Sequence, residues 1–188
     1  MIGFYVVAGV VALAVIAGVV LFNRLVARRQ MANNGWSDID VQLKRRADLV
    51  PQLVAAVKAY AAHEKSLFEE VVEKRGQALA AGDDVNARGA AETALSKPVG
   101  RLLAVAEAYP ELKASDNFLG LQKELADTED MIEMARRFYN GAVRELNTAV
   151  ESFPSNLLAG AFGFSQRTYF EIEPADRPVP SLGLDAGP

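Results

Sequence analysis

An uncharged run near the amino terminus constrains this 188-residue chain more than any other feature. Residues Ile2 to Phe22 read IGFYVVAGVVALAVIAGVVLF and contain no charged side chain. As a helix with a rise of about 1.5 Å per residue, this run covers roughly 30 Å, which is the thickness of the hydrocarbon core of a bilayer. The sequence therefore predicts a transmembrane anchor over residues 1–23, with Ile2 and Phe22 at the ends of the span.

A cleaved signal peptide is the main alternative for this run. Signal peptides carry a basic segment before the apolar stretch and a cleavage site with small residues after it. Here only the amino terminus precedes the run and NRLVARRQ follows it, and the absence of cysteine excludes a lipoprotein. We therefore expect the anchor to be retained.

Three arginines close to the carboxyl end of the span predict its orientation. Arg24, Arg28 and Arg29 lie within about two turns of Phe22, whereas almost no positive charge precedes the span. The positive-inside rule then places the body of the protein in the cytoplasm of a bacterium, with the amino terminus outside the inner membrane. We expect these arginines to contact lipid headgroups.

Charge is distributed unevenly along the rest of the chain. Residues 23–46 hold six basic and two acidic side chains, a net charge of +4, and residues 47–188 hold 14 basic and 22 acidic ones, a net charge of −8. The overall charge of −4 argues against a nucleic-acid-binding protein. A basic neck joined to an acidic body favours contact between neighbouring copies of the chain.

The body has the periodicity of long helices. One apolar stripe advances in steps of three and four residues between a capping residue, Ser115, and Pro154, which is typical of a bundle or coiled-coil helix. Its positions are Phe118, Leu121, Leu125, Thr128, Ile132, Ala135, Tyr139, Ala142, Leu146, Ala149 and Phe153. Two further apolar faces cover residues 50–72 and 85–108, and Pro98 and Gly100 are expected to kink the second.

The predicted fold is all-α, with an N-terminal single transmembrane helix followed by an antiparallel bundle of three to four long helices. Residues 24–50 form a basic stalk or first helix, residues 51–165 the bundle, and residues 166–188 a proline-rich, disordered tail. The uncharged stretch at residues 154–164 is expected to be a short helix that packs back on the bundle. A surface that inserts into lipid or a partner is the alternative.

The stretch WSDIDVQLKRRADLVPQLV, residues 36–54, allows two backbone paths. A new helix begins here if Ser37 caps it and Asp40 completes a capping box. The interpretation that we favour is a nearly continuous helix from the membrane, with Gly35 as a hinge. In both cases Pro51 predicts a change of chain direction.

The same stretch contains the basic triplet Lys44, Arg45 and Arg46. Lys44 lies 22 residues after Phe22, which is about 33 Å along a helix, far beyond the Debye length of about 8 Å. The triplet is therefore expected to contact a protein rather than lipid. A solvated basic patch is the alternative, with Asp40 and Lys44 paired at helical spacing.

Trp36, Tyr139 and Asn140 are further candidates for interaction. Tyr139 is expected in the core with Asn140 bonded beside it, unless Asn140 fixes the register between two helices. Trp36 either packs against the stalk or contacts the membrane interface. Glu70–Lys74 and Glu133–Arg137 have the spacing of helical ion pairs.

No pattern of residues indicates catalysis. His63 is the single histidine and lacks the H-E-x-x-H and paired Glu-x-x-His contexts of metal sites. Cysteine is absent and no glycine-rich phosphate loop occurs. We therefore expect a protein without catalytic, cofactor-binding or metal-binding residues, and not an enzyme.

Four stretches in the same order resemble the LemA family: WSDIDVQLKRRADLVPQLV, VAEAYPELKASDNFLGLQKEL, RRFYNGAVRELN and FPSNLLAGAFGF. The resemblance covers residues 20–170. It implies a single-pass anchor with a cytoplasmic helical domain and no defined activity, and some relatives are associated with internal membranes or encoded near membrane-bound proteases. Two functions follow as expectations. The first is a self-associating scaffold that organises or shapes the membrane, and the alternative is an accessory subunit that binds another membrane protein such as a protease or sensor.

Overall fold

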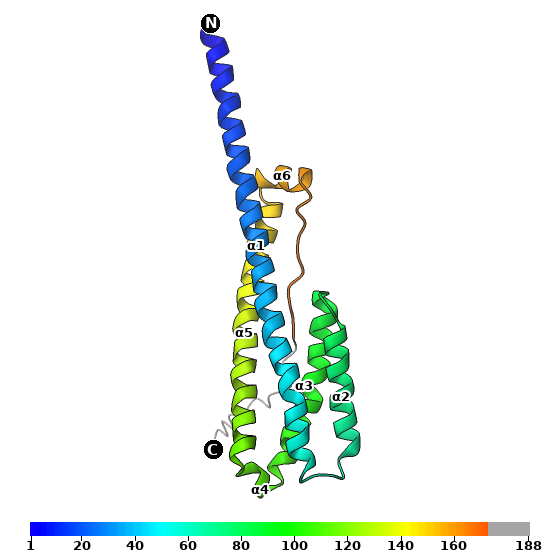
Figure 1. Ribbon diagram of the computed structural model, residues 1–188. Coiled ribbons are helices and arrows are strands. Elements are labelled where there is room, and N and C mark those ends of the chain that lie inside the picture. The colour runs from blue at the N-terminus through cyan, green and yellow to red at the C-terminus, as the bar shows by residue number, and fades with distance from the viewer. Residues whose placement is uncertain (173–188) are drawn as a thin grey trace, which may run out of the picture.

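The computed structural model describes residues 1–172, which are arranged as a helical bundle beneath a projecting helix (Figure 1). The helices are α1 (Ile2–Lys58), α2 (Lys65–Ala80), α3 (Val85–Glu107), α4 (Pro110–Lys113), α5 (Asp116–Glu151) and α6 (Ser155–Ala161). The longer helices α1, α2, α3 and α5 alternate in direction. The structure therefore confirms an all-α fold with one long apolar N-terminal helix followed by helices that pack together.

Helix α1 runs without a break from the apolar segment into the bundle. Its 57 residues correspond to about 85 Å. The apolar part projects beyond the bundle in Figure 1, and Leu25 is the first buried residue of the helix. A window of this part has a mean hydropathy of 2.7 with none of its residues buried, so α1 is the one helix of residues 1–172 that is long and apolar enough to cross a membrane.

The favoured continuity of the neck is confirmed, but the hinge at Gly35 is wrong. The Ser37 hydroxyl donates to the Asn33 carbonyl oxygen at 3.2 Å, a bond within the helix rather than an N-cap. A Cβ at Gly35 would lie 3.0 Å from Tyr139 Cα and 3.1 Å from Phe138 Cδ1. Glycine at this position therefore lets α1 approach the α5 backbone closely.

The sequence predicts a change of chain direction at Pro51. The chain instead changes direction after Lys58. Pro51 lies inside α1, where its ring nitrogen cannot donate to the carbonyl oxygen of Ala47. Arg75 of α2 supplies a donor instead, because its Nε lies 2.6 Å from that oxygen. One helix thus joins the residue ranges 1–23, 24–50 and the start of 51–165, and a loop at residues 59–64 divides the apolar face expected over residues 50–72.

The apolar stripe of α5 faces the core as predicted. All of its positions are buried except Ala135, which is half-buried, and Phe153, which is 79% exposed. Thr128 satisfies its hydroxyl by donating to the Glu124 carbonyl oxygen at 2.7 Å. Phe153 leaves the stripe because α5 ends at Glu151, one residue before the chain turns towards α6.

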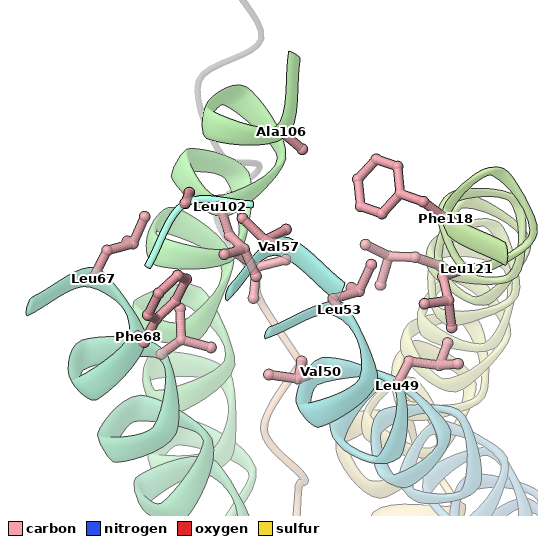
Figure 2. Packing of buried hydrophobic residues seen from close by; sticks show 14 of the residues in the cluster. Leu49, Val50, Leu53, Val57, Leu67, Phe68, Leu102, Ala106, Phe118 and Leu121 are labelled. Atoms are coloured by element: carbon pink, nitrogen blue, oxygen red, sulfur yellow. The ribbon is translucent and has the colours of Figure 1, made fainter. Parts of the chain in front are cut away.

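Helix α3 is one helix from Val85 to Glu107 and includes both Pro98 and Gly100. Asp84 caps its start by accepting from the Ala87 amide at 2.7 Å. Its inward residues join the core cluster at the end of the bundle far from the span, where α1, α2, α3 and α5 meet (Figure 2). Side chains of this cluster labelled in Figure 2 include Val50, Leu53, Val57, Phe68, Leu102 and Phe118.

The chain after α6 returns along the bundle in an extended path (Figure 1). We call residues Gln166 to Ile172 the strap. The expectation of a disordered tail from residue 166 is wrong for the strap, whose Phe170 is fully buried and whose backbone is bonded to α5. Residues 173–188, with the prolines of the expected tail, lie outside the described residues.

Candidate interaction site on helices α1 and α5

Arg46 lies at the centre of a buried ion network. It is only 2% exposed, and its Nε lies 3.0 Å from Glu129 on α5 while its Nη1 lies 3.5 Å from Glu92 on α3. Its Nη2 donates to Ser96 Oγ at 2.7 Å. Neither contact with another protein nor a solvated patch, the two expectations for the triplet, therefore holds for Arg46, whose charge compensates the buried carboxylate of Glu92.

Arg88 extends this network along the same side of α3. Its Nε contacts Glu92 at 3.2 Å and its Nη2 contacts Asp40 at 3.3 Å, so the partner of Asp40 is Arg88 rather than Lys44. Burial raises the pKa of Glu92 above its ordinary value of 4.5, while the charges of Arg46 and Arg88 oppose that rise. The network connects α1, α3 and α5 at one level along the bundle axis and so fixes their relative positions.

The other two residues of the basic triplet remain at the surface. Lys44 and Arg45 are exposed, and neither forms an ion pair within residues 1–172. They stay candidates for contact with another protein. Sequence reasoning missed Arg88 and Glu92, although a Glu four residues after an Arg on the inner face of an alanine-rich helix was a signal for a buried pair.

Asn140 holds the strap against α5. Its Oδ1 accepts from the Phe170 amide at 2.8 Å and its Nδ2 donates to the Phe170 carbonyl oxygen at 3.0 Å. Asn147 makes the same pair of bonds to Arg167, at 2.8 and 2.9 Å. Asn140 therefore fixes an extended segment rather than the register between two helices. Sequence reasoning missed Asn147, although its spacing of one heptad from Asn140 was the available signal.

An aromatic cluster closes over the strap. The rings of Trp36 and Phe170 lie 5.3 Å apart, and those of Trp36 and Tyr139 lie 5.6 Å apart. Tyr139 donates its hydroxyl to the Thr168 carbonyl oxygen at 3.0 Å, and burial raises its pKa above the ordinary value of 10.0. Trp36 thus packs within the protein, and Tyr139 is the core residue that the stripe predicted.

A second apolar stripe lies on the outer face of α5, and sequence reasoning missed it. Met131, Met134 and Phe138 are 45%, 49% and 49% exposed. Their spacing of three and four residues places them on one side of the helix. Because two residues correspond to about 200° of helical rotation, Phe138 lies on the side of α5 opposite Asn140 and the strap. About half of each of these side chains is exposed in the single chain, and the Phe138 ring also lies beside Gly35 of α1.

The arginines after the span lie where α1, α5 and α6 meet. Arg24 is exposed, whereas Arg28 contacts Glu145 of α5 at 3.6 Å. The Arg29 guanidinium lies over the Phe164 ring, 4.8 Å from its centre. Arg28 and Arg29 therefore connect α1 with other elements of the protein. Their contact with lipid headgroups stays a prediction.

The remaining charged candidates are at the surface. His63 is exposed and lies 3.5 Å from Glu64. Glu133 and Arg137 form the predicted pair at 3.3 Å, but Glu70 pairs with Arg101 rather than with Lys74. Within residues 1–172, no three His, Cys, Asp or Glu side chains lie close enough together to hold a metal ion.

The buried ion network and the strap both lie within the part of the chain that matches a known protein family. The model of the LemA family matches residues 35–183. The chain is 28% identical to magnetosome proteins MamQ 1 and MamQ 2 of Paramagnetospirillum magneticum and 27% identical to magnetosome protein MamQ of Magnetospirillum gryphiswaldense. Each alignment covers 84% of this chain and 68% of the relative.

Proposed function

This chain belongs to the LemA family, and from that premise we propose that it is a membrane-anchored scaffold whose helical bundle self-associates through the outer face of α5. The apolar part of α1 spans the bacterial inner membrane, the bundle lies in the cytoplasm, and assembled copies organise the membrane around them. The protein catalyses no reaction. The observation that carries the proposal is the exposed outer stripe of Met131, Met134 and Phe138.

The spacing of the outer stripe suits contact between helices. Large apolar side chains three and four residues apart are the pattern by which two α-helices pack along a common seam. Each of the three is half-exposed in the single chain and would be removed from water by the same stripe of a second copy. Methionine and phenylalanine supply large apolar area for such a contact.

Charge favours a second copy as the partner. The exposed surface of α5 around the stripe carries a net charge of −2, with the acidic Glu124, Asp127, Asp130 and Glu133 against the basic Lys123 and Arg137. Lys44 and Arg45 are exposed on α1 at the same height, because the adjacent Arg46 contacts Glu129. Two copies anchored in one bilayer are related by an axis along the membrane normal, so residues at equal height meet and the basic pair of one copy faces the acidic helix of the other.

Orientation and the lack of catalysis have separate support. Arg24, Arg28 and Arg29 follow the span, which favours a cytoplasmic bundle. Three charged residues are buried among the described ones: Arg46, Arg88 and Glu92. They form ion pairs with one another, so their burial does not require a catalytic acid or base. The similar proteins are named for the magnetosome, a cellular structure, and not for a reaction.

The test measures assembly size of the full chain extracted in mild detergent, by light scattering after size exclusion and by crosslinking in native membranes. We expect homo-oligomers for the wild type. Met134→Glu should reduce them strongly by placing a charge in the seam. Val72→Glu is the matched control, because Val72 is 60% exposed on α2, away from α5, and it should leave assembly unchanged.

High salt should weaken the wild-type assembly in part, because exposed charge pairs are screened while the apolar stripe is not. A monomeric wild type would contradict self-association. A monomer that co-purifies with a different membrane protein would favour the accessory-subunit alternative. Assembly that survives Met134→Glu unchanged would show that the outer stripe is not the contact.

A further inference from the structure

The segment around α6 has several large apolar side chains that are exposed to solvent. Residues 152–165 contain no charged side chain. Phe153, Leu157 and Phe162 within this segment are 79%, 65% and 59% exposed. Such a cluster on a small element marks a contact with an apolar partner.

The height of this segment points to the partner. The Phe162 ring lies 5.0 Å from the ring of Phe22, the last residue of the apolar span, and the Phe164 ring lies 5.8 Å from it. Figure 1 shows α6 crosswise beside α1, at the end of the bundle from which the span projects. The segment therefore lies on one side of α1, beside the end of the apolar span.

The opposite side of the segment is fixed to the protein. Ala159 and Phe164 are buried in a cluster with Leu25 of α1 and Ala149 of α5. Arg29 covers the Phe164 ring. Because this inner side is held by packing on two helices, the outward direction of Leu157 and Phe162 is set by the fold rather than by a mobile loop.

We propose that residues 152–164 form a second membrane contact, with Phe153, Leu157 and Phe162 in the boundary between headgroups and acyl chains of the leaflet on the bundle side. The inference rests on the proposed role of α1 as an anchor, since α1 sets the position of the bilayer. Lipid is favoured over a protein partner because the apolar surface continues directly from the span at Phe22. Aromatic and aliphatic side chains at this depth are stabilised by the interface.

A membrane contact beside the span has a structural effect. A single helix leaves the bundle free to rotate about the helix axis and to tilt. A second contact beside the span restricts both movements and presents the outer stripe of α5 in a defined direction in the membrane plane. Neighbouring copies would then meet with less loss of orientational freedom.

The chain contains no cysteine, so single cysteines can be introduced into the full-length protein and spin-labelled. We choose Leu157→Cys and Phe162→Cys as test positions, Val11→Cys in the span as the lipid reference, and Val72→Cys on α2 as the water reference. All four positions are more than half exposed, so labels do not disturb the core. The protein is reconstituted in vesicles of phosphatidylethanolamine and phosphatidylglycerol, and relaxation by oxygen and by a water-soluble nickel chelate is compared.

We expect the ratio of oxygen to nickel accessibility at residues 157 and 162 to exceed that at residue 72 several-fold, below the value at residue 11. Values equal to that at residue 72 would overturn the membrane contact while leaving the anchor and self-association intact. Protection from both reagents, with dipolar coupling between labels on different copies, would assign the segment to a protein interface and overturn it as well. A water-accessible label at residue 11 would refute the anchor itself, and with it this inference.

Discussion

Arg75 Nε donates to the main-chain carbonyl oxygen of Ala47 across the α1–α2 interface, at 2.6 Å. In an uninterrupted helix this oxygen would accept from the amide of residue 51, which is proline. Arg75 therefore satisfies a carbonyl group that the helix cannot satisfy itself, and it explains why α1 continues through Pro51 to Lys58.

The first prediction concerns this bond. Arg75→Leu should lower the free energy of unfolding by about 1.5–3 kcal/mol, the range for a hydrogen bond to a charged group. In a Pro51→Ala background, where the amide is restored, the same substitution should cost clearly less. Chemical denaturation of the four proteins in detergent measures this double-mutant cycle. Lys74→Leu is the control, since Lys74 contacts only nearby residues of its own helix. Equal costs of Arg75→Leu in both backgrounds would refute the coupling.

The second prediction separates two helical glycines. Gly35→Ala should destabilise the protein by about 1–3 kcal/mol, because its Cβ would lie 3.0 Å from the α5 backbone, which cannot shift cheaply. Gly141→Ala is the matched control on α5, with no atom within 4 Å of the added Cβ, and should stabilise the protein by up to about 1 kcal/mol. Thermal unfolding in detergent compares the two. Stabilisation by Gly35→Ala would show that the close approach of α1 to α5 does not require glycine.

The third prediction concerns neighbouring arginines of the triplet. Arg46→Leu should destabilise the bundle by about 3–5 kcal/mol, because it leaves the buried Glu92 with less compensating charge. Arg45→Leu should change stability by less than about 0.5 kcal/mol, because Arg45 is exposed. Denaturation curves of both variants measure the two changes in the free energy of unfolding. Similar small effects for both would mean that the network is not needed for folding.

The fourth prediction is a pH dependence that arises from Glu92. Burial raises its pKa above 4.5, so the folded state holds the proton of this carboxyl more tightly than the unfolded chain does. The stability that this group contributes is present below the pKa of the unfolded chain and declines as pH rises through the folded-state pKa. The stability of the wild type relative to Glu92→Gln should therefore fall as pH rises from the ordinary value of 4.5 through the folded-state pKa. Unfolding free energies of both proteins across this range provide the measurement, and a difference that grows with pH would contradict the raised pKa.

The parts of the fold that the sequence predicts are those with a local repeating signal. The inner stripe of α5 is buried from Phe118 to Ala149, and the span is a single helix, because both patterns depend only on helical geometry. The reversal at residues 59–64 was not predicted, since AYAAHE contains no glycine or proline to mark a turn.

The candidate site was predicted only in part because its contacts join distant residues. Arg46 and Glu92 are 46 positions apart, and Gly35 and Tyr139 are 104 apart, so neither pairing has a local pattern. The strap lacks periodicity and reads as disordered, yet the amide groups of Asn140 and Asn147 bond its backbone. Such bonds depend on where the tertiary structure places the extended chain.

The continuity of α1 has a mechanical consequence. From Phe22 to Lys58 the helix extends for 36 residues, about 54 Å, as one stiff rod. The fit between the length of an apolar span and the thickness of the bilayer influences the tilt of that span. With the span in a bilayer, a change in tilt of about 10° would move the Lys58 end sideways by about 9 Å, a displacement that the membrane contact proposed for residues 152–164 would limit.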